Sequence, residues 1–169
     1  ARVGEYIYAV DDENMEEVVA KLLKDNCLTV ACAESCTGGM LASRLTSISG
    51  SSMYIKGSIV TYSNEAKMKF LDVDKEILDT KGAVSPEVAK QMAEGVRKAV
   101  GSDIGVGITG IAGPTGGTDT KPVGSVYIAV AGKDNTVVKE NIFSGDRARV
   151  RYRSTQQALE MIRQYIKNK

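Results

Sequence analysis

The chain has 169 residues and a mass of 18.1 kDa, the length of a single domain that can bury about two thirds of its unfolded surface in one core. Its apolar fraction of 43% and charged fraction of 25% are close to globular averages and exclude disordered, collagen-like and coiled-coil chains. The net charge of +1 gives no global electrostatic reason to expect nucleic acid or anionic lipid as a partner. The sequence contains no histidine, which excludes a Ser-His-Asp triad, a Cys-His dyad and a histidine-ligated zinc within this chain.

The three cysteines are Cys27, Cys32 and Cys36. Their odd number and their crowding are unlike the disulfide framework of a secreted protein, and their spacing matches neither a CxxC redox motif nor a zinc knuckle. The N-terminal segment 1–20 is acidic, the reverse of a signal peptide, and no apolar run has the length of a membrane span. We therefore expect a soluble cytoplasmic protein without a membrane partner, in which the cysteines are small buried residues.

The predicted elements begin after a short N-terminal segment. Residues 1–11 show no helical period and are interpreted as a linker remnant, which leaves residues 12–169 as the folded domain. Apolar residues at helical spacing predict an amphipathic helix from residue 12 or 14 to about residue 25. The apolar run 28–33 predicts a strand buried on both faces, followed by a tight turn at two glycines and a further helix.

The remaining elements alternate between helices and strands. The triplet Ser85-Pro86-Glu87 predicts a helix start, with Ser85 as N-cap and Pro86 at the first helical position. The other predicted elements are a strand over 53–62, short helices over 64–70 and 74–79, a strand over 103–109, a hairpin of strands 123–131 and 136–143, and a helix over 146–167. This order indicates an α/β fold, a three-layer α/β/α sandwich with a mixed, mostly parallel sheet of about five strands.

The first candidate site lies where the first predicted strand turns into a helix. The segment 34–39 places side chains at the carboxyl end of a strand, beside unpaired helix N–H groups, which suits an anion. Ser35 or Thr37 is there either a helix N-cap or part of a functional site. Gly38 and Gly39 favour the second interpretation, because they let a substrate approach the backbone and let N–H groups converge on a developing oxyanion.

A second candidate group follows the predicted strand 53–62. Ser63 or Asn64 can cap the next helix, which puts Lys67 in the first turn, where the helix dipole disfavours an ammonium by roughly 0.3–1 kcal/mol. This energy is less than one pKa unit, so burial or a second cation would have to supply the rest of the shift that a base near neutral pH needs. The alternatives to a base and a proton relay are a surface lysine at Lys67 and a rim aromatic at Tyr62.

Two further segments could contact a ligand. The loop 110–117 holds four glycines and one proline, a composition that suits backbone packed against a ligand, although it has neither Walker A nor Rossmann spacing. Arg147, Arg149, Arg151 and Arg153 lie two residues apart on a predicted helix, so they divide between nearly opposite faces and form no nucleic-acid-binding stripe. Arg147 is best placed to reach inward to a phosphate or carboxylate, and we expect the others to be solvated.

Five ordered motifs carry the functional interpretation further. They are Ala33-Glu34-Ser35-Cys36-Thr37-Gly38-Gly39, Val60-Thr61-Tyr62-Ser63-Asn64-Glu65-Ala66-Lys67, Gly82-Ala83-Val84-Ser85, Thr109-Gly110-Ile111-Ala112-Gly113-Pro114 and Lys121-Pro122-Val123-Gly124. Together they resemble the CinA C-terminal domain family, and the resemblance runs from about residue 12 to the end of the chain. The leading Gly4-Glu5-Tyr6-Ile7-Tyr8 is similar to the junction of two-domain CinA proteins, which implies a fused N-terminal molybdopterin-binding-like domain in the full protein.

The resemblance implies an activity, because the characterised reaction of that family is deamidation of nicotinamide mononucleotide (NMN). The carboxamide of NMN is hydrolysed to nicotinic acid mononucleotide and ammonia, in pyridine-nucleotide recycling. By motif, Ser35 is the nucleophile, Lys67 the general base and acid, and Tyr62 a relay or positioning hydroxyl. A Ser/Lys pair would also explain how a chain without histidine performs acyl transfer.

The resemblance further implies a set of binding residues. They are Thr37, Gly38, Gly39, Thr109, Gly110, Arg147 and Arg149. Backbone N–H groups around Thr37, Gly38 and Gly110 would hold the oxyanion, and Thr109 would line the pocket. Arg147 is the first candidate for the phosphate, and Arg149 is the second. The scheme requires no metal and no organic cofactor, and the family implies a homodimer.

Two alternatives stay open from the sequence. Cys36 could replace Ser35 as the nucleophile of the same reaction class. The domain could also be a non-catalytic nucleotide-sensing module that governs a fused partner domain. Direct binding of nucleic acid is not expected, given the balanced charge and the divided arginines.

Overall fold

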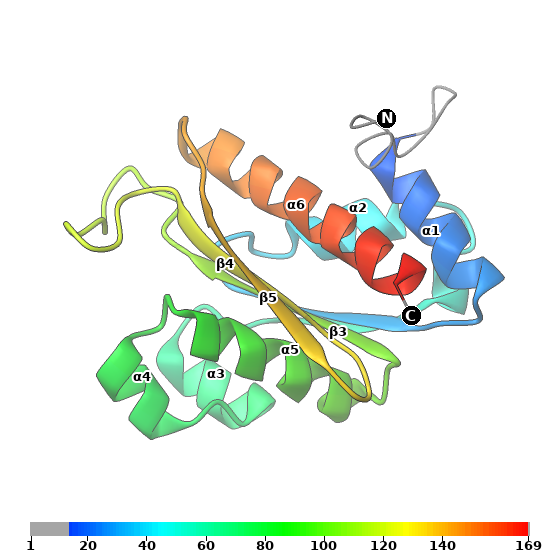
Figure 1. The fold of residues 1–169 in the computed structure, drawn as a ribbon, viewed down its shortest axis with the longest axis horizontal. Coiled ribbons are helices and arrows are strands. Elements are labelled where there is room, and N and C mark those ends of the chain that lie inside the picture. Colours follow the sequence, from blue (N-terminus) through cyan, green and yellow to red (C-terminus); the bar gives the residue numbers. More distant parts are fainter. Residues whose placement is uncertain (1–13, 169) are drawn as a thin grey trace.

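A five-stranded sheet forms the centre of the molecule, with helices on both faces (Figure 1). The computed structural model describes residues 14–168, and the expected linker over residues 1–11 lies outside this range. The strands are β1 (Val30–Glu34), β2 (Ile55–Val60), β3 (Ile104–Gly110), β4 (Ser125–Ala131) and β5 (Thr136–Ile142), in the sheet order β2-β1-β3-β4-β5.

The strand directions make the sheet mixed. β1 pairs in parallel with β2 and β3, whereas β4 pairs antiparallel with β3 and β5. β4 therefore runs opposite to the other four strands. β1 and β4 are buried along their whole length. In the edge strands β2 and β5, partly buried residues alternate with exposed residues along most of the strand. These findings confirm the predicted three-layer α/β/α sandwich with a mixed sheet, parallel at its start.

Each face of the sheet is covered by a group of helices (Figure 1). The helices of one face are α1 (Met15–Asp25), α2 (Met40–Thr46) and α6 (Arg147–Lys167), and those of the other are α3 (Asn64–Leu71), α4 (Lys75–Lys81) and α5 (Pro86–Val100). The predicted start of α5 is confirmed, because the backbone N–H of Val88 donates to Ser85 Oγ at 3.3 Å and Pro86 is the first helical residue.

Several predicted strand boundaries are wrong by one or two residues. The strand expected from residue 53 begins at Ile55, and Met53 ends a short 3₁₀ helix, Ser51–Met53. The aromatic side chain of Tyr54, which favours a strand by propensity, is instead buried, and its hydroxyl donates to the carbonyl of Leu45 at 2.7 Å. Tertiary packing against α2 thus overrides the local β preference of this segment.

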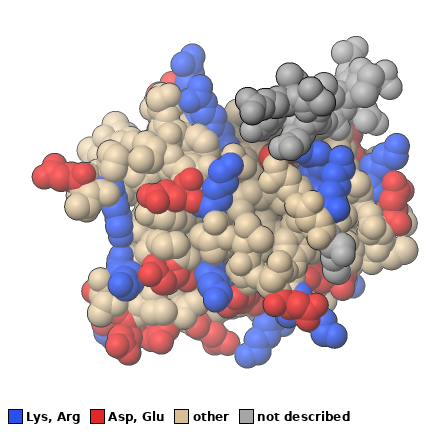
Figure 2. Space-filling model, viewed as in Figure 1, with Lys and Arg blue, Asp and Glu red and all other residues tan. Residues whose placement is uncertain are grey.

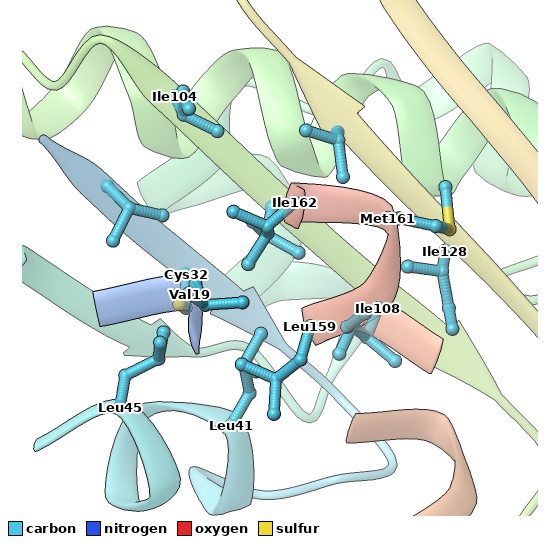
Figure 3. Close-up of a cluster of buried hydrophobic side chains, with 14 of the residues drawn as sticks. Val19, Cys32, Leu41, Leu45, Ile104, Ile108, Ile128, Leu159, Met161 and Ile162 are labelled. Carbon is cyan, nitrogen blue, oxygen red and sulfur yellow. The ribbon is translucent and has the colours of Figure 1, made fainter. Parts of the chain in front are cut away.

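The larger hydrophobic core lies between the sheet and the helices α1, α2 and α6 (Figure 3). Leu41 and Leu45 of α2 face Ile108 of β3 and Leu159 and Ile162 of α6 in this cluster. A second cluster packs α3 and α5 against β1. Neither α6 nor any other helix within residues 14–168 combines the length and the apolar character that crossing a membrane requires.

Two glycines let backbone pack directly on backbone on the α5 side of the sheet. A Cβ at Gly107 of β3 would overlap the carbonyl oxygen of Ala89 in α5, and a Cβ at Gly95 of α5 would overlap the carbonyl oxygen of Leu71 in α3. Both helices therefore approach more closely than any side chain would allow. The stack β3, α5 and α3 is consequently built on contacts that cannot adjust by rotamer changes.

Replacing Gly95 by alanine is expected to lower the free energy of unfolding by about 1–3 kcal/mol, because the new methyl group forces α3 and α5 apart. Helix propensity alone predicts the opposite sign, a gain of about 1 kcal/mol. Urea unfolding measures the difference. Ala99→Gly, at an exposed position of the same helix, calibrates the propensity contribution, and a more stable Gly95→Ala protein would contradict the close approach.

Candidate functional site

The candidate residues meet at one edge of the sheet, at the carboxyl ends of β1, β2 and β3. β1 lies between β2 and β3, and all three run in the same direction. The chain leaves β1 toward α2 on one face and leaves β2 toward α3 on the other (Figure 1). Such a reversal of strand order separates the two connecting loops and is the usual place for a ligand in an open α/β sheet.

Ser35 and Lys67 are brought together at this edge. Lys67 Nζ lies 3.3 Å from Ser35 Oγ and donates to the carbonyl oxygen of Thr61 at 2.9 Å. Ser63 caps α3, since its Oγ accepts from the N–H of Ala66 at 3.1 Å, and this cap fixes the helical turn that carries Lys67. Two residues far apart in the sequence thus share a hydrogen bond.

The environment of Lys67 favours the neutral amine. The side chain is 1% exposed, and burial lowers its pKa from the ordinary value of 10.5. Among the described residues no carboxylate forms a salt bridge with Nζ, whose hydrogen-bond acceptors are the neutral oxygens of Thr61 and Ser35. The sequence allowed a surface lysine at this position, and that alternative is wrong.

The turn after β1 holds Ser35 in place. The Ser35 N–H donates to the carbonyl of Ile108 in β3 at 3.0 Å, and Gly38 and Gly39 have positive φ angles of 59° and 91°. The N–H of Gly38 donates to the Ser35 carbonyl, and the N–H of Gly39 donates to the Glu34 carboxylate. These two N–H groups therefore close the turn itself, and the N–H of Gly38, which we expected to hold an oxyanion, already donates to the Ser35 carbonyl.

β3 contributes Gly110 and Thr109 to the same edge. The N–H of Ile111 donates to Ser125 of β4, so the N–H of Gly110, one residue earlier, points the other way, toward the end of β1 and Ser35. Thr109 is 1% exposed, and its hydroxyl donates to the carbonyl of Ala83 at 2.7 Å. The Thr109 side chain therefore holds the loop before α5, whereas we expected it to line the pocket.

Among the described residues, Tyr62 hydrogen-bonds to Arg147 and not to Ser35 or Lys67. Its side chain is 63% exposed, and its hydroxyl accepts a hydrogen bond from Arg147 Nη2 at 3.0 Å. Arg147 Nη1 donates to the carbonyl of Gly113 at 3.0 Å. Arg147 thus links the start of α6 to the loops after β2 and β3, as its inward direction predicted, and the contact of Tyr62 is with a cation and not with the proposed nucleophile or base.

The other arginines of α6 differ in where they point. Arg151, one turn after Arg147, donates to the carbonyl of Thr37 at 2.7 Å, so the prediction of a solvated side chain at this position is wrong. Arg149 is exposed and lines a surface hollow with Tyr152 and Arg153, so the structure does not bring it to the dyad. The i, i+4 spacing of Arg147 and Arg151 was the available signal for a shared face.

On the face shown in Figure 2, basic and acidic side chains are interspersed.

Cys36 is packed in the large core cluster and is 5% exposed. Burial raises the pKa of its thiol to about 12. A thiol in this state is protonated at neutral pH, and the thiolate is the form that attacks a carbonyl carbon. The geometry therefore favours Ser35 over Cys36 as the nucleophile.

Comparison with known proteins assigns the fold and these motifs to one family. The family model described as CinA C-terminal domain matches residues 12–166. The chain belongs to the CinA C-terminal domain family. This CinA domain is 54% identical over 161 residues to a competence-damage inducible protein of Moorella thermoacetica, covering 95% of this chain and 39% of that protein. It is 49% identical over 165 residues to a CinA-like protein of Kosmotoga olearia, covering 98% of this chain and 40% of that protein.

Solved structures agree with the assignment. The structure of the competence/damage inducible protein CihA from Agrobacterium tumefaciens matches this CinA domain with a TM-score of 0.84 and 39% identity, covering 91% of this chain and 96% of that one. A CinA superfamily protein from Klebsiella pneumoniae matches with a TM-score of 0.88 and 31% identity, covering 93% and 100%. The chain spans about 40% of the length of the curated relatives it matches.

Proposed function

We propose that this CinA domain hydrolyses the carboxamide of NMN to nicotinic acid mononucleotide and ammonia, with Ser35 as nucleophile and Lys67 as general base and acid. The observation that carries the proposal is the 3.3 Å contact between Ser35 Oγ and a lysine amine that is buried and has no carboxylate partner among residues 14–168. A nucleophilic alcohol beside a desolvated amine, which serves as its base, can perform acyl transfer without histidine. We also propose that the domain acts as a homodimer and within a longer polypeptide.

The first half of the reaction forms an acyl-enzyme. Ser35 Oγ attacks the carboxamide carbon while its proton moves to Lys67 Nζ, whose remaining N–H donates to the Thr61 carbonyl. The carbonyl oxygen becomes an oxyanion, for which the N–H groups near Thr37 and at Gly110 are the candidate donors. When the C–N bond breaks, Lys67 gives its proton to the leaving nitrogen, and ammonia departs.

The second half repeats these transfers with water. Lys67 takes a proton from a water molecule as its oxygen attacks the ester carbon, and a second oxyanion forms. The C–O bond to Ser35 then breaks, and Lys67 returns the proton to Ser35 Oγ. The product leaves as the carboxylic acid of nicotinic acid mononucleotide, which gives its proton to water or to the released ammonia, and the Ser35/Lys67 pair is regenerated, so no step consumes a cofactor.

The proposal is tested by incubating the purified domain with NMN and measuring both products. We expect ammonia and nicotinic acid mononucleotide in equal amounts, with nicotinamide riboside, which lacks the phosphate, as a poorer substrate. Tight binding of NMN without ammonia release would contradict the proposal and would favour the nucleotide-sensing module.

Replacing Arg147 by alanine is expected to raise KM for NMN by about 10-fold to 100-fold, the loss of a charge-assisted hydrogen-bonded pair to the phosphate. KM for nicotinamide riboside should change little, because that substrate has no phosphate. Arg149→Ala is the matched control, since Arg149 lies on the same turn and lines a surface hollow with Tyr152 and Arg153, whereas Arg147 donates to the residues after β2 and β3. A larger rise of KM in the Arg149 variant would reverse the assignment.

A further inference from the structure

A buried carboxylate directly precedes the proposed nucleophile. Glu34 is the last residue of β1 and is 0% exposed. Its Oε2 accepts from the N–H groups of Gly39 and Leu41, each at 3.1 Å, and its Oε1 accepts from the N–H of Ala42 at 2.9 Å. Both oxygens are therefore bound by the start of α2, which satisfies the hydrogen-bonding requirement of a buried anion.

These bonds close the segment that carries Ser35. Gly39 is the N-cap of α2 and makes no side-chain cap of its own, so the Glu34 carboxylate caps this helix from the other end of the turn. The backbone of Glu34 is also fixed, because its carbonyl accepts from the N–H of Thr61 at 2.9 Å. The turn 35–38 is thus held at its entrance by the sheet and at its exit by a carboxylate.

We infer that Glu34 is a positioning residue: its carboxylate holds the turn 35–38 so that Ser35 Oγ faces Lys67 Nζ. The inference rests on the proposed Ser35/Lys67 chemistry. Glu34 itself does not act on the substrate, because it is fully buried and its oxygens are occupied by backbone N–H groups. Its effect on the reaction comes from fixing the position of Ser35.

The test uses two variants of Glu34 and one matched control. Glu34→Gln removes the charge and turns an NH₂ group toward backbone N–H donors, and Glu34→Asp keeps the charge but shortens its reach by one methylene group. Tyr54→Phe is the control, because it removes a buried hydrogen bond to Leu45 at the other end of the same helix. All three variants should melt at a lower temperature than the unaltered protein.

Separate measurement of kcat and KM distinguishes a positioning role of Glu34 from a role in fold stability alone. Glu34→Gln is expected to lower kcat for ammonia release from NMN by about 10-fold to 100-fold, with KM within about threefold. Glu34→Asp should show a smaller loss of kcat, and Tyr54→Phe should keep kcat within about twofold despite its lower melting temperature. An unaltered kcat in Glu34→Gln, a change confined to KM, or an equal loss of kcat in Tyr54→Phe would overturn the inference.

A second readout does not depend on NMN being the substrate. A small fluorophosphonate forms a bond between Ser35 Oγ and phosphorus, expels fluoride and gives the serine proton to Lys67, and mass spectrometry follows the labelling. Glu34→Gln should label Ser35 about 10-fold more slowly than the unaltered protein and Tyr54→Phe at its full rate. If the unaltered protein is labelled without hydrolysing NMN, the proposed function fails and this rate ratio alone decides the role of Glu34. Equal labelling rates in the unaltered protein and in Glu34→Gln would overturn the inference about Glu34, and so would the absence of labelling at Ser35 in either protein.

Discussion

Ser35→Ala is expected to reduce the rate of ammonia release from NMN by about 10³-fold or more, with the fold intact. Ser35 is half-buried, and its Oγ makes a 3.3 Å contact with Lys67 Nζ, so its loss removes the nucleophile and leaves only a small cavity. KM should change little, because the binding groups stay. Steady-state kinetics with a coupled ammonia assay measure both quantities.

The control for Ser35 is its neighbour. Cys36→Ala should keep most of the activity, because the thiol of Cys36 is packed in the core with a pKa raised by burial to about 12. It should cost some stability, since a buried side chain is truncated. The opposite pattern, an active Ser35→Ala protein and an inactive Cys36→Ala protein, would transfer the role of nucleophile to Cys36.

Lys67→Met is expected to lower kcat by about 10³-fold, because within residues 14–168 Lys67 is the side chain that hydrogen-bonds Ser35 Oγ and can accept its proton. In the unaltered protein kcat/KM should rise with pH as Lys67 loses its proton and should level off above the folded-state pKa, which burial places below 10.5. The neutral amine is the active form, so activity is lost on the acid side. An acid limb centred at or above 10.5 would contradict the role of Lys67 as base.

The same substitution should stabilise the fold by about 1 kcal/mol or more at neutral pH, because a buried amine without a carboxylate partner is replaced by an apolar side chain of similar length. Between the lowered pKa of Lys67 and 10.5, the unfolded chain binds more protons than the native one, so the stability of the unaltered protein rises with pH. The advantage of Lys67→Met should therefore shrink as the pH approaches 10.5. Urea unfolding at several pH values measures it, and a less stable variant at neutral pH would contradict the cost of burying this amine.

Local signals in the sequence were sufficient for most of the fold. Capping residues such as Ser85 and apolar periodicity fix where a helix begins and which face it buries, and both are properties of neighbouring residues. The start of β2 could not be placed, because the burial of Tyr54 depends on a contact with Leu45 in a different element. That information is tertiary and has no local signature.

The candidate site was predictable in its motifs and less so in its contacts. Ser35 and Lys67 meet because β1 and β2 are adjacent parallel strands, which the alternation of elements suggests but does not prove. The contact of Arg151 with Thr37 and the capping by Glu34 depend on how α6 and α2 pack. In the sequence, these residues are only an arginine on a predicted helix and a glutamate next to a serine. A buried glutamate at the end of an apolar strand is the one local signal that could have pointed to Glu34.

The bare backbone contacts at Gly95 and Gly107 have a consequence for the reactive amine. Lys67 lies on α3, and α3 rests on α5, which rests on β3, through surfaces that carry no side chain at the point of contact. The distance between the serine oxygen and the lysine nitrogen therefore depends on direct backbone contacts and not on side chains that can change conformation. Because these contacts are rigid, surface residues of the domain can be substituted over evolution while the two reacting atoms keep their distance.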